Sequence, residues 1–258
     1  MFPVFVYEEK KIIFITSLKC AYSSLVSYMR DIKGLPENTP VKIILNKCKL
    51  NAKKDYSDYK IIRFYRSPYK RILSNFVYWF VRIGLQTPKY QDHPTNKYFN
   101  SNQSLQFKTF RKFIKIMYKQ KMLNDINCYK NINFHFKDQV YFLKNNQKLN
   151  EYPTYKFVNI DENGIKKLNK ELNLKIPHTN FLNYEKNKQK NINNYEKPPF
   201  LLKIEELKKI EFEIPNYEKF YNKRIKRMIE FIYKDDFDYF AENGIYFSFN
   251  LNFENIKN

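Results

Sequence analysis

A short segment near the N-terminus carries the residue types that bind a phosphate group. Ile12–Ile15 is continuously apolar, as in a strand buried on both faces, and the loop that follows it contains Lys19. Where such a loop enters a helix, the backbone N–H groups at the helix N-terminus can bind an anion. The hydroxyls of Ser23 and Ser24, at the start of the expected helix, add hydrogen-bond donors. The sequence therefore indicates an anion site within residues 17–24.

Two features of this loop leave a plainer interpretation open. The loop contains no glycine, so the GxxxxGK[ST] pattern of ordinary nucleotide triphosphatases is absent. Taken alone, the segment also fits a solvent-facing Lys19 followed by a serine that caps the helix.

A second candidate for phosphate binding begins at the end of Lys60–Tyr65, the clearest strand of the sequence. Ligands of open α/β sheets bind at the C-terminal ends of the strands, and Arg66 lies at such an end. Pro68 fits the first turn of the next helix, and Ser74 follows about two helical turns after Arg66. A guanidinium and a hydroxyl suit a second phosphate, whereas Arg71 is expected to form a structural ion pair. Arg66 alone would fit an exposed charge equally well.

Together the two segments resemble a known family, the sulfotransferases that use 3′-phosphoadenosine 5′-phosphosulfate (PAPS), in particular the Golgi-type carbohydrate sulfotransferase branch (sulfotransferase family 2). The 5′-phosphosulfate loop of that branch, PKxAxTS, resembles Ser17–Ser24, which keeps the lysine, the alanine and two hydroxyls but lacks the proline. The 3′-phosphate motif of the branch, RxPxxRxxS, is matched at every defining position by Arg66–Ser74.

Weaker similarities to the same branch continue along the chain from about Phe14 to Tyr246. They are Asn133–Gln139 (HWxPQ, with Phe for Trp and Asp for Pro), Phe157–Glu162 (FVGxxE), Pro177–Asn180 (PHxN) and Tyr233–Phe240 (YxxDFxxF). They occur in the family's order, and the 3′-phosphate motif is the most specific of them all.

The resemblance implies roles for individual residues. Lys19 would contact the bridging oxygen of the leaving group and stabilise the charge that develops there. Arg66 and Ser74 would bind the 3′-phosphate of PAPS. The 5′-phosphosulfate would be held by Lys19, Cys20, Ala21, Tyr22, Ser23 and Ser24. No metal is expected, and the acceptor is expected to be a hydroxyl group of a carbohydrate, in a glycan or a glycolipid.

The general base that takes the acceptor proton is left open among three residues. Some members of the family place a catalytic histidine between the two phosphate motifs, and this sequence has none there. His135 lies in one of the weaker similarities, His93 lies in a long polar segment, and Glu162 follows an expected strand. His178, which follows Pro177, is expected to be structural.

Strands that alternate with helices predict an α/β fold with a mostly parallel central sheet flanked by helices. The resemblance implies that this is the P-loop-containing nucleotide hydrolase-like (sulfotransferase) fold. We expect one domain over residues 1–258, with a core from about 4 to 248 and flexible loops at about 87–103 and 186–199. The expected strands are Val4–Tyr7, Lys11–Thr16, Val41–Leu45, Lys60–Tyr65 and Tyr155–Ile160. The expected helices are Ser23–Asp31, Tyr69–Val81, Ser104–Tyr118, Asn163–Leu172 and Phe220–Tyr233.

Composition excludes several classes of protein. Aromatic residues make up 18% of the chain, far more than a disordered protein contains. Cys20, Cys48 and Cys128 are too few for a disulfide scaffold, and their spacing does not fit a structural zinc site. No segment is apolar over the length of a membrane span and no signal peptide is evident, so we expect a soluble cytoplasmic protein.

The net charge of +21 leaves two alternative functions open. A nucleic-acid-binding protein is the first, with tyrosine and phenylalanine rings stacking on bases. However, the lysines are spread along the chain and no nucleic-acid motif appears, so nucleic acid is not an expected partner. A phosphotransferase with an atypical phosphate loop is the second, weakened by the missing glycines and by the lack of an evident acidic pair for a metal ion.

Overall fold

The computed structural model describes residues 3–82, 109–123, 136–144, 147–160, 163–177, 197–209 and 217–247. The chain divides into two compact units, each formed from two separate stretches of sequence. The first unit contains Met1–Ser67 and Asp138–Asn180, and the second contains Pro68–Lys137 and Phe181–Asn258. The single domain expected over residues 1–258 stays a prediction.

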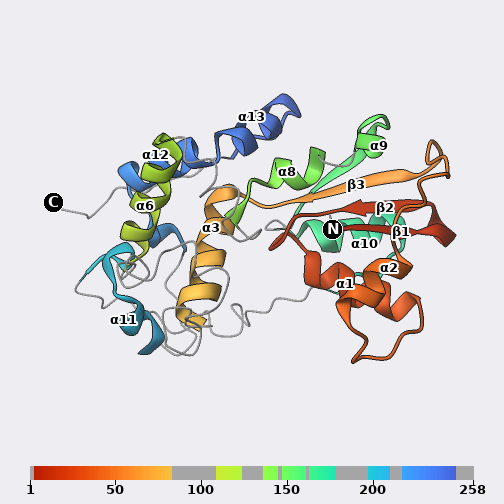
Figure 1. Cartoon of the computed structure of the whole chain (residues 1–258), viewed down its shortest axis with the longest axis horizontal. Helices are drawn as coiled ribbons and strands as arrows, with labels where there is room; N and C mark the ends of the chain where they lie inside the picture. The colour runs from red at the N-terminus through yellow and green to blue at the C-terminus, as the bar shows by residue number, and fades with distance from the viewer. Residues whose placement is uncertain are drawn as a thin grey trace. The chain divides into compact units, whose positions relative to one another are not determined.

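A four-stranded sheet forms the centre of the first unit, with the strands in the order β1–β2–β3–β4 (Figure 1). The strands are β1 (Val4–Tyr7), β2 (Ile12–Ile15), β3 (Lys60–Tyr65) and β4 (Thr154–Asn159). The short 3-10 helix η1 (Glu8–Lys10) joins β1 to β2, which are antiparallel. β3 is parallel to β2, and β4 is parallel to β3. The predicted α/β fold with a mostly parallel sheet is therefore confirmed.

Three helices cover one face of this sheet: α1 (Tyr22–Ile32), α2 (Val41–Lys47) and α10 (Gly164–Leu172). Successive residues of a strand point to opposite faces, so Ile62 and Phe64 of β3 share the face that these helices cover. They form one apolar cluster with Leu25 of α1, Ile44 of α2 and Leu168 of α10. Because this cluster holds α1 against the sheet, it also fixes both ends of the loop between β2 and α1.

The opposite face of β3 carries a buried guanidinium. Arg63 is 3% exposed, and its side chain donates hydrogen bonds to the carbonyl oxygens of Leu143 and Leu149 and, over 2.8 Å, to the hydroxyl of Thr154. Leu143 belongs to α8 (Gln139–Lys144) and Leu149 to α9 (Gln147–Asn150), which lie on the other side of the sheet from α1 and α2 (Figure 1). Arg63 thus holds α8 beside the C-terminal half of β3.

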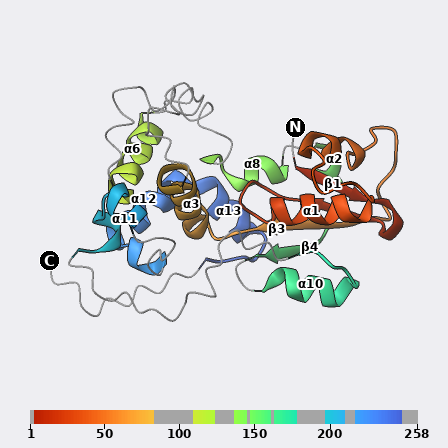
Figure 2. The ribbon, with the colours of Figure 1, turned by 90° about the horizontal axis from the view of Figure 1, so that it is seen from below.

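The described part of the second unit consists mainly of helices. They are α3 (Pro68–Phe76), its π-helical continuation η2 (Val77–Arg82), α6 (Phe110–Met122), α11 (Ile204–Lys209), α12 (Lys223–Ile232) and α13 (Lys234–Glu242), with the 3-10 helices η5 (Pro199–Leu201) and η6 (Tyr217–Phe220). α6 and α12 lie side by side (Figure 2). The Lys121 ammonium donates to the carbonyl oxygen of Ile232 over 2.7 Å, and the rings of Tyr118 and Phe231 lie 5.0 Å apart.

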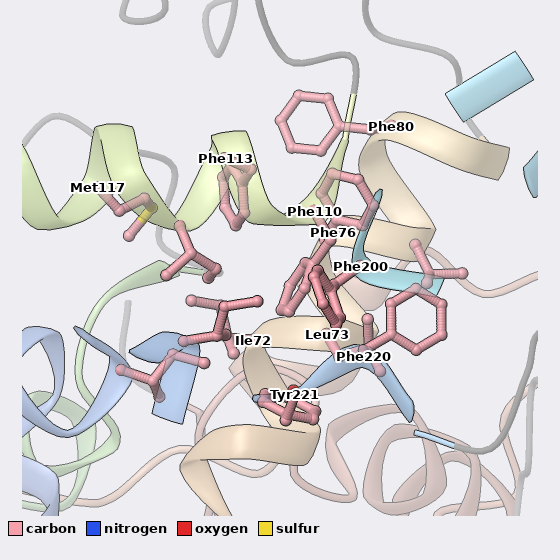
Figure 3. Packing of buried hydrophobic residues seen from close by; sticks show 14 of the residues in the cluster. Ile72, Leu73, Phe76, Phe80, Phe110, Phe113, Met117, Phe200, Phe220 and Tyr221 are labelled. Carbon is pink, nitrogen blue, oxygen red and sulfur yellow. The ribbon is translucent and has the colours of Figure 1, made fainter. Parts of the chain in front are cut away.

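Aromatic rings dominate the core of the second unit, where Phe113 of α6 points toward Phe76 of α3 (Figure 3). The ring of Phe113 is fully buried and lies 5.4 Å from the rings of Phe76 and Phe80 and 5.5 Å from that of Phe136. Phe110, one helical turn earlier, lies 5.2 Å from Phe76. At these separations the rings are tilted or edge to face, and such arrangements are more favourable than a face-to-face sandwich.

One predicted strand is wrong. Val41–Leu45 lies within helix α2, where only Ile44 is buried and Val41 and Ile43 are more than 40% exposed. A short apolar run fits a strand or a helix equally well. Pro40, which precedes the run as the N-cap residue, is compatible with the start of a helix.

Two predicted helices begin later than expected. The helix expected from Ser104 begins at Phe110, because Thr109 is its N-cap and accepts a hydrogen bond from the Lys112 N–H over 3.2 Å. The helix expected from Phe220 begins at Lys223, after the N-cap residue Asn222. The predicted loop at 87–103 lies outside the described residues, as does most of the loop predicted at 186–199.

Candidate functional site

The loop between β2 and α1 has a backbone conformation that is uncommon for residues with side chains. Lys19 and Ala21 have φ angles of 68° and 64°, in the left-handed region that glycine favours. Each such residue costs about 1–3 kcal/mol and persists only where its surroundings impose it. Cys20, between them, has no positive φ angle, so left-handed and other conformations alternate along the loop. The loop therefore turns sharply without the glycine that its sequence lacks.

Buried hydrogen bonds fix the base of this loop. Thr16, Ser17 and Cys20 are fully buried. The Thr16 hydroxyl donates to the carbonyl oxygens of Ser17, over 3.0 Å, and of Cys20, and the Cys20 N–H donates to the Ser17 carbonyl over 3.1 Å. Lys19, by contrast, is only half-buried. The loop is thus rigid at its base and leaves its lysine in partial contact with solvent.

The first turn of α1 supplies backbone and hydroxyl donors next to this lysine. The N-cap residue is Ala21, whose side chain has no oxygen to accept from the N–H groups of the first turn. The partial positive charge at the N-terminus of an 11-residue helix favours an anion there. Ser23 is exposed and Ser24 is 4% exposed. Burial raises the pKa of the Tyr22 phenol, so this hydroxyl stays neutral and adds no negative charge to the site.

Arg66 lies at the same edge of the sheet as this loop. β2 and β3 are parallel, and Ile15 at the end of β2 is paired with Arg63 near the end of β3. The residues that follow the two strands, Thr16 and Arg66, therefore leave the sheet at its C-terminal edge, where open α/β sheets bind their ligands. Arg66 is half-buried.

One buried side chain joins the loop to Arg66. The amide of Gln139, the first residue of α8, is fully buried. Its oxygen accepts from the Arg66 N–H over 2.9 Å and from the Cys20 thiol over 3.0 Å, and its nitrogen donates to the Arg66 carbonyl over 2.8 Å. The structure thus brings the two predicted anion-binding segments together through a residue that the sequence analysis did not select. The signal for it was present, because Gln139 is the glutamine of the segment that resembles HWxPQ.

Comparison with known families decides the class of protein. The model described as the sulfotransferase family matches residues 3–241. The chain belongs to the sulfotransferase family. The resemblance drawn from Ser17–Ser24 and Arg66–Ser74 is therefore confirmed, and the enzyme transfers sulfuryl groups. A search of curated proteins finds no match to the sulfotransferase, and neither does a search of solved structures.

The predicted 5′-phosphosulfate loop of the sulfotransferase contains a buried serine hydroxyl. The Ser17 Oγ atom is inaccessible to solvent and has no hydrogen-bond partner within the described residues. A buried hydroxyl without a partner costs about 1–3 kcal/mol. Together with the Lys19 ammonium and the α1 N-terminus, it makes a set of donors that fits an anionic group.

The other predicted site residues lie on α3 or outside the described residues. Ser74 lies on α3 in the second unit and is half-buried. The predicted bases His135, His93 and Glu162 lie outside the described residues, as does His178. The identity of the base in the sulfotransferase stays a prediction.

The described residues contain no group of three or more His, Cys, Asp or Glu that could hold a metal ion. None of the helices in the described part of the sulfotransferase is both long enough and apolar enough to cross a membrane.

Proposed function

We propose that this sulfotransferase moves the sulfuryl group of PAPS to a hydroxyl group of a carbohydrate, in a glycan or a glycolipid. The observation that carries the proposal is the meeting of the Lys19 loop and Arg66 at one edge of a parallel sheet. PAPS has a phosphosulfate at the 5′ position of its ribose and a phosphate at the 3′ position. Two separate segments with cationic side chains match that pair of anions.

The residues of the first unit fit both ends of this donor. For the 5′-phosphosulfate they offer the Lys19 ammonium, the Ser17 and Ser23 hydroxyls and the N–H groups of the first turn of α1. For the 3′-phosphate they offer the Arg66 guanidinium, and the motif adds Ser74 as a prediction. Cys20, Ala21, Tyr22 and Ser24 complete the predicted binding loop. These groups supply the positive charge, so the proposal requires no metal ion.

In this proposal Lys19 does more than bind. When bound, PAPS supplies the sulfuryl group, whose bond to the bridging oxygen breaks as a bond to the acceptor oxygen forms. The Lys19 ammonium would donate a hydrogen bond to that bridging oxygen, where negative charge grows as the bond breaks. An interaction that strengthens toward the transition state raises the rate, whereas uniform binding does not. The rigid base of the loop supports this role, because it reduces the reorganisation that the lysine needs.

The acceptor hydroxyl must also lose a proton as the new bond forms. A base within hydrogen-bond reach takes that proton, and His135, His93 and Glu162 remain the predicted candidates. A carbohydrate acceptor rests on the similarity of Arg66–Ser74 to the carbohydrate branch. A cytoplasmic location likewise stays a prediction from the sequence.

Thermal unfolding with nucleotides tests the donor. Adenosine 3′,5′-bisphosphate, the product of sulfuryl transfer from PAPS, should stabilise the protein by about 2.7 kcal/mol at roughly 100 times its dissociation constant. ATP with magnesium should stabilise it much less, because it lacks the 3′-phosphate. An equal or larger effect of ATP would contradict PAPS as the donor.

Transfer of label tests the acceptor. The protein is incubated with sulfur-labelled PAPS and a panel of glycans, glycolipids, tyrosine peptides and small alcohols. We expect label in a glycan or a glycolipid. Label that enters only the tyrosine peptides or the small alcohols would refute the carbohydrate acceptor and leave the donor unaffected.

A further inference from the structure

Gln139 takes the place of a strand neighbour for the first residue after β3. The Tyr65 carbonyl still accepts from the Ile160 N–H, over 3.1 Å, at the end of the β3–β4 pairing. At Arg66 the pairing changes, because the N–H and the carbonyl both bond to the Gln139 amide. Buried backbone groups need such partners. The Gln139 side chain thus supplies to Arg66 the two backbone hydrogen bonds that a neighbouring strand would otherwise supply.

The orientation of this amide follows from its contacts. The Arg66 N–H can only donate and the Arg66 carbonyl can only accept, so the Gln139 oxygen must face the first and its nitrogen the second. The same oxygen accepts from the Cys20 thiol, so both of its lone pairs are in use. No charged or shorter side chain could make all three hydrogen bonds at this position.

Through these contacts Gln139 links the two anion-binding segments. Cys20 stands between the left-handed residues Lys19 and Ala21, and Arg66 carries the guanidinium predicted for the 3′-phosphate. The Cys20 side chain and the Arg66 backbone are therefore bonded to one and the same side chain, which is itself fully buried.

We propose that Gln139 is a positioning residue that sets the spacing between the 5′-phosphosulfate loop and Arg66. With this spacing, a nucleotide that has phosphates at its 5′ and 3′ positions contacts both segments at the same time. The inference rests on the proposed function. Gln139 does not contact the donor in this proposal and acts only through the Cys20 thiol and the backbone of Arg66. A purely structural Gln139 would instead stabilise the fold without favouring nucleotides that carry both phosphates.

The ratio of two affinities separates these roles. Adenosine 5′-monophosphate reaches only the loop, whereas adenosine 3′,5′-bisphosphate reaches both segments. In the wild-type protein the bisphosphate should bind more tightly, and the ratio of the two dissociation constants measures how well both segments are engaged at once. Gln139→Leu should reduce that ratio at least about fivefold, the lower end of usual coupling between two sites. A structural defect would weaken both nucleotides equally and leave the ratio unchanged.

Gln120→Leu is the matched control, because it makes the same change on α6 in the second unit. The oxygen of the half-buried Gln120 has no hydrogen-bond partner within the described residues. Its ratio should equal that of the wild type. An unchanged ratio in a folded Gln139→Leu protein, or an equal reduction in both variants, would overturn the proposal.

A second variant keeps the test decisive if Gln139→Leu does not fold. Gln139→Glu retains an acceptor for the Arg66 N–H and the Cys20 thiol but cannot donate to the Arg66 carbonyl while it is ionised. Its ratio should be low at neutral pH and should recover toward the wild-type ratio, measured at the same pH, as the carboxyl gains a proton. A ratio that does not differ from wild type at any pH would refute positioning by Gln139. A wild-type protein that shows no preference for the bisphosphate would instead refute the proposed donor.

Discussion

The two units of this sulfotransferase bury different kinds of group, and the difference separates what sets the site from what stabilises the fold. At the sheet edge of the first unit, directional hydrogen bonds from the buried Thr16 and Gln139 determine where the loop and Arg66 lie. In the second unit, α3, α6 and α12 meet through rings and aliphatic side chains, with Phe113 at the centre of several ring contacts. The second unit also buries polar groups, but the packing of its core depends mainly on the volume of its apolar side chains.

This comparison makes a general expectation. A change of one polar atom at the sheet edge of the first unit should alter ligand affinity or rate more than stability, because it moves a charged group without removing much buried apolar surface. A change of volume in the second unit should do the reverse. Each variant below tests one side of that division.

The largest effect on stability is expected from Phe113→Ala. The ring of Phe113 is fully buried, and its loss leaves a cavity among Phe76, Phe80 and Phe136. The substitution should lower the free energy of unfolding by about 3–5 kcal/mol, measured by urea denaturation. Phe231→Ala, at a ring that is 41% exposed, is the control and should cost much less. Equal losses in the two variants would show that ring packing does not set the stability of this unit.

The next effect is on rate and comes from Lys19→Met. If the ammonium stabilises the leaving-group oxygen, single-turnover sulfuryl transfer at saturating PAPS should fall about 10²–10³-fold. The free energy of unfolding should change little, because Lys19 is only half-buried. Lys42→Met, at an exposed lysine of α2 in the same unit, is the control and should keep the wild-type rate. A rate for Lys19→Met within about threefold of wild type would remove this lysine from the mechanism.

A smaller effect, on affinity, is expected from Arg66→Ala. If Arg66 binds the 3′-phosphate as proposed, the variant loses a charge-assisted contact of about 1.5–3 kcal/mol, and calorimetry with adenosine 3′,5′-bisphosphate measures the loss of affinity. The backbone groups of Arg66 that bond to Gln139 remain, so the fold should be kept. Arg30→Ala removes the same kind of side chain near the C-terminal end of α1 and should leave the affinity unchanged. Unchanged affinity in Arg66→Ala would mean that the 3′-phosphate motif has been misassigned.

Much of the first unit could be predicted from the sequence because its signals are local. β3 has the predicted bounds, Lys60–Tyr65, since a run of apolar residues before a turn at Pro68 leaves little freedom. α10 (Gly164–Leu172) likewise begins and ends within one residue of the prediction. The helix in place of the strand at Val41–Leu45 was missed because a short apolar run does not record which of its residues are buried.

The link between the two predicted phosphate-binding segments could not be predicted in this way. Gln139 lies 119 residues from Cys20 and 73 residues from Arg66 along the chain, so no local pattern relates them. The left-handed conformations of Lys19 and Ala21 were equally hidden, because glycine is the residue that normally signals such a turn. The sequence could predict candidate anion-binding residues but not the contacts that hold them in place.

The smallest effect is expected from Asp55→Asn, which tests whether hydrogen bonds of the first unit away from the sheet edge act only on stability. The side-chain and backbone donors of Ser57 and the hydroxyl of Tyr152 lower the pKa of the Asp55 carboxyl to about 2, from an ordinary value of 3.8. A group whose pKa is lower in the folded state contributes stability above its unfolded pKa and loses that contribution as the pH falls toward the folded pKa. Wild-type stability should therefore decline between about pH 4 and pH 2 in part through Asp55, and urea midpoints across that range should decline less steeply in Asp55→Asn.

Asp58→Asn, which removes an exposed carboxylate that accepts from Lys11 over 2.5 Å, is the control for the loss of one negative charge. Identical pH profiles for the wild type and Asp55→Asn would show that this carboxyl contributes nothing. A change in affinity for adenosine 3′,5′-bisphosphate in Asp55→Asn would break the comparison itself, because the polar contacts that set the site would then extend beyond the edge of the sheet.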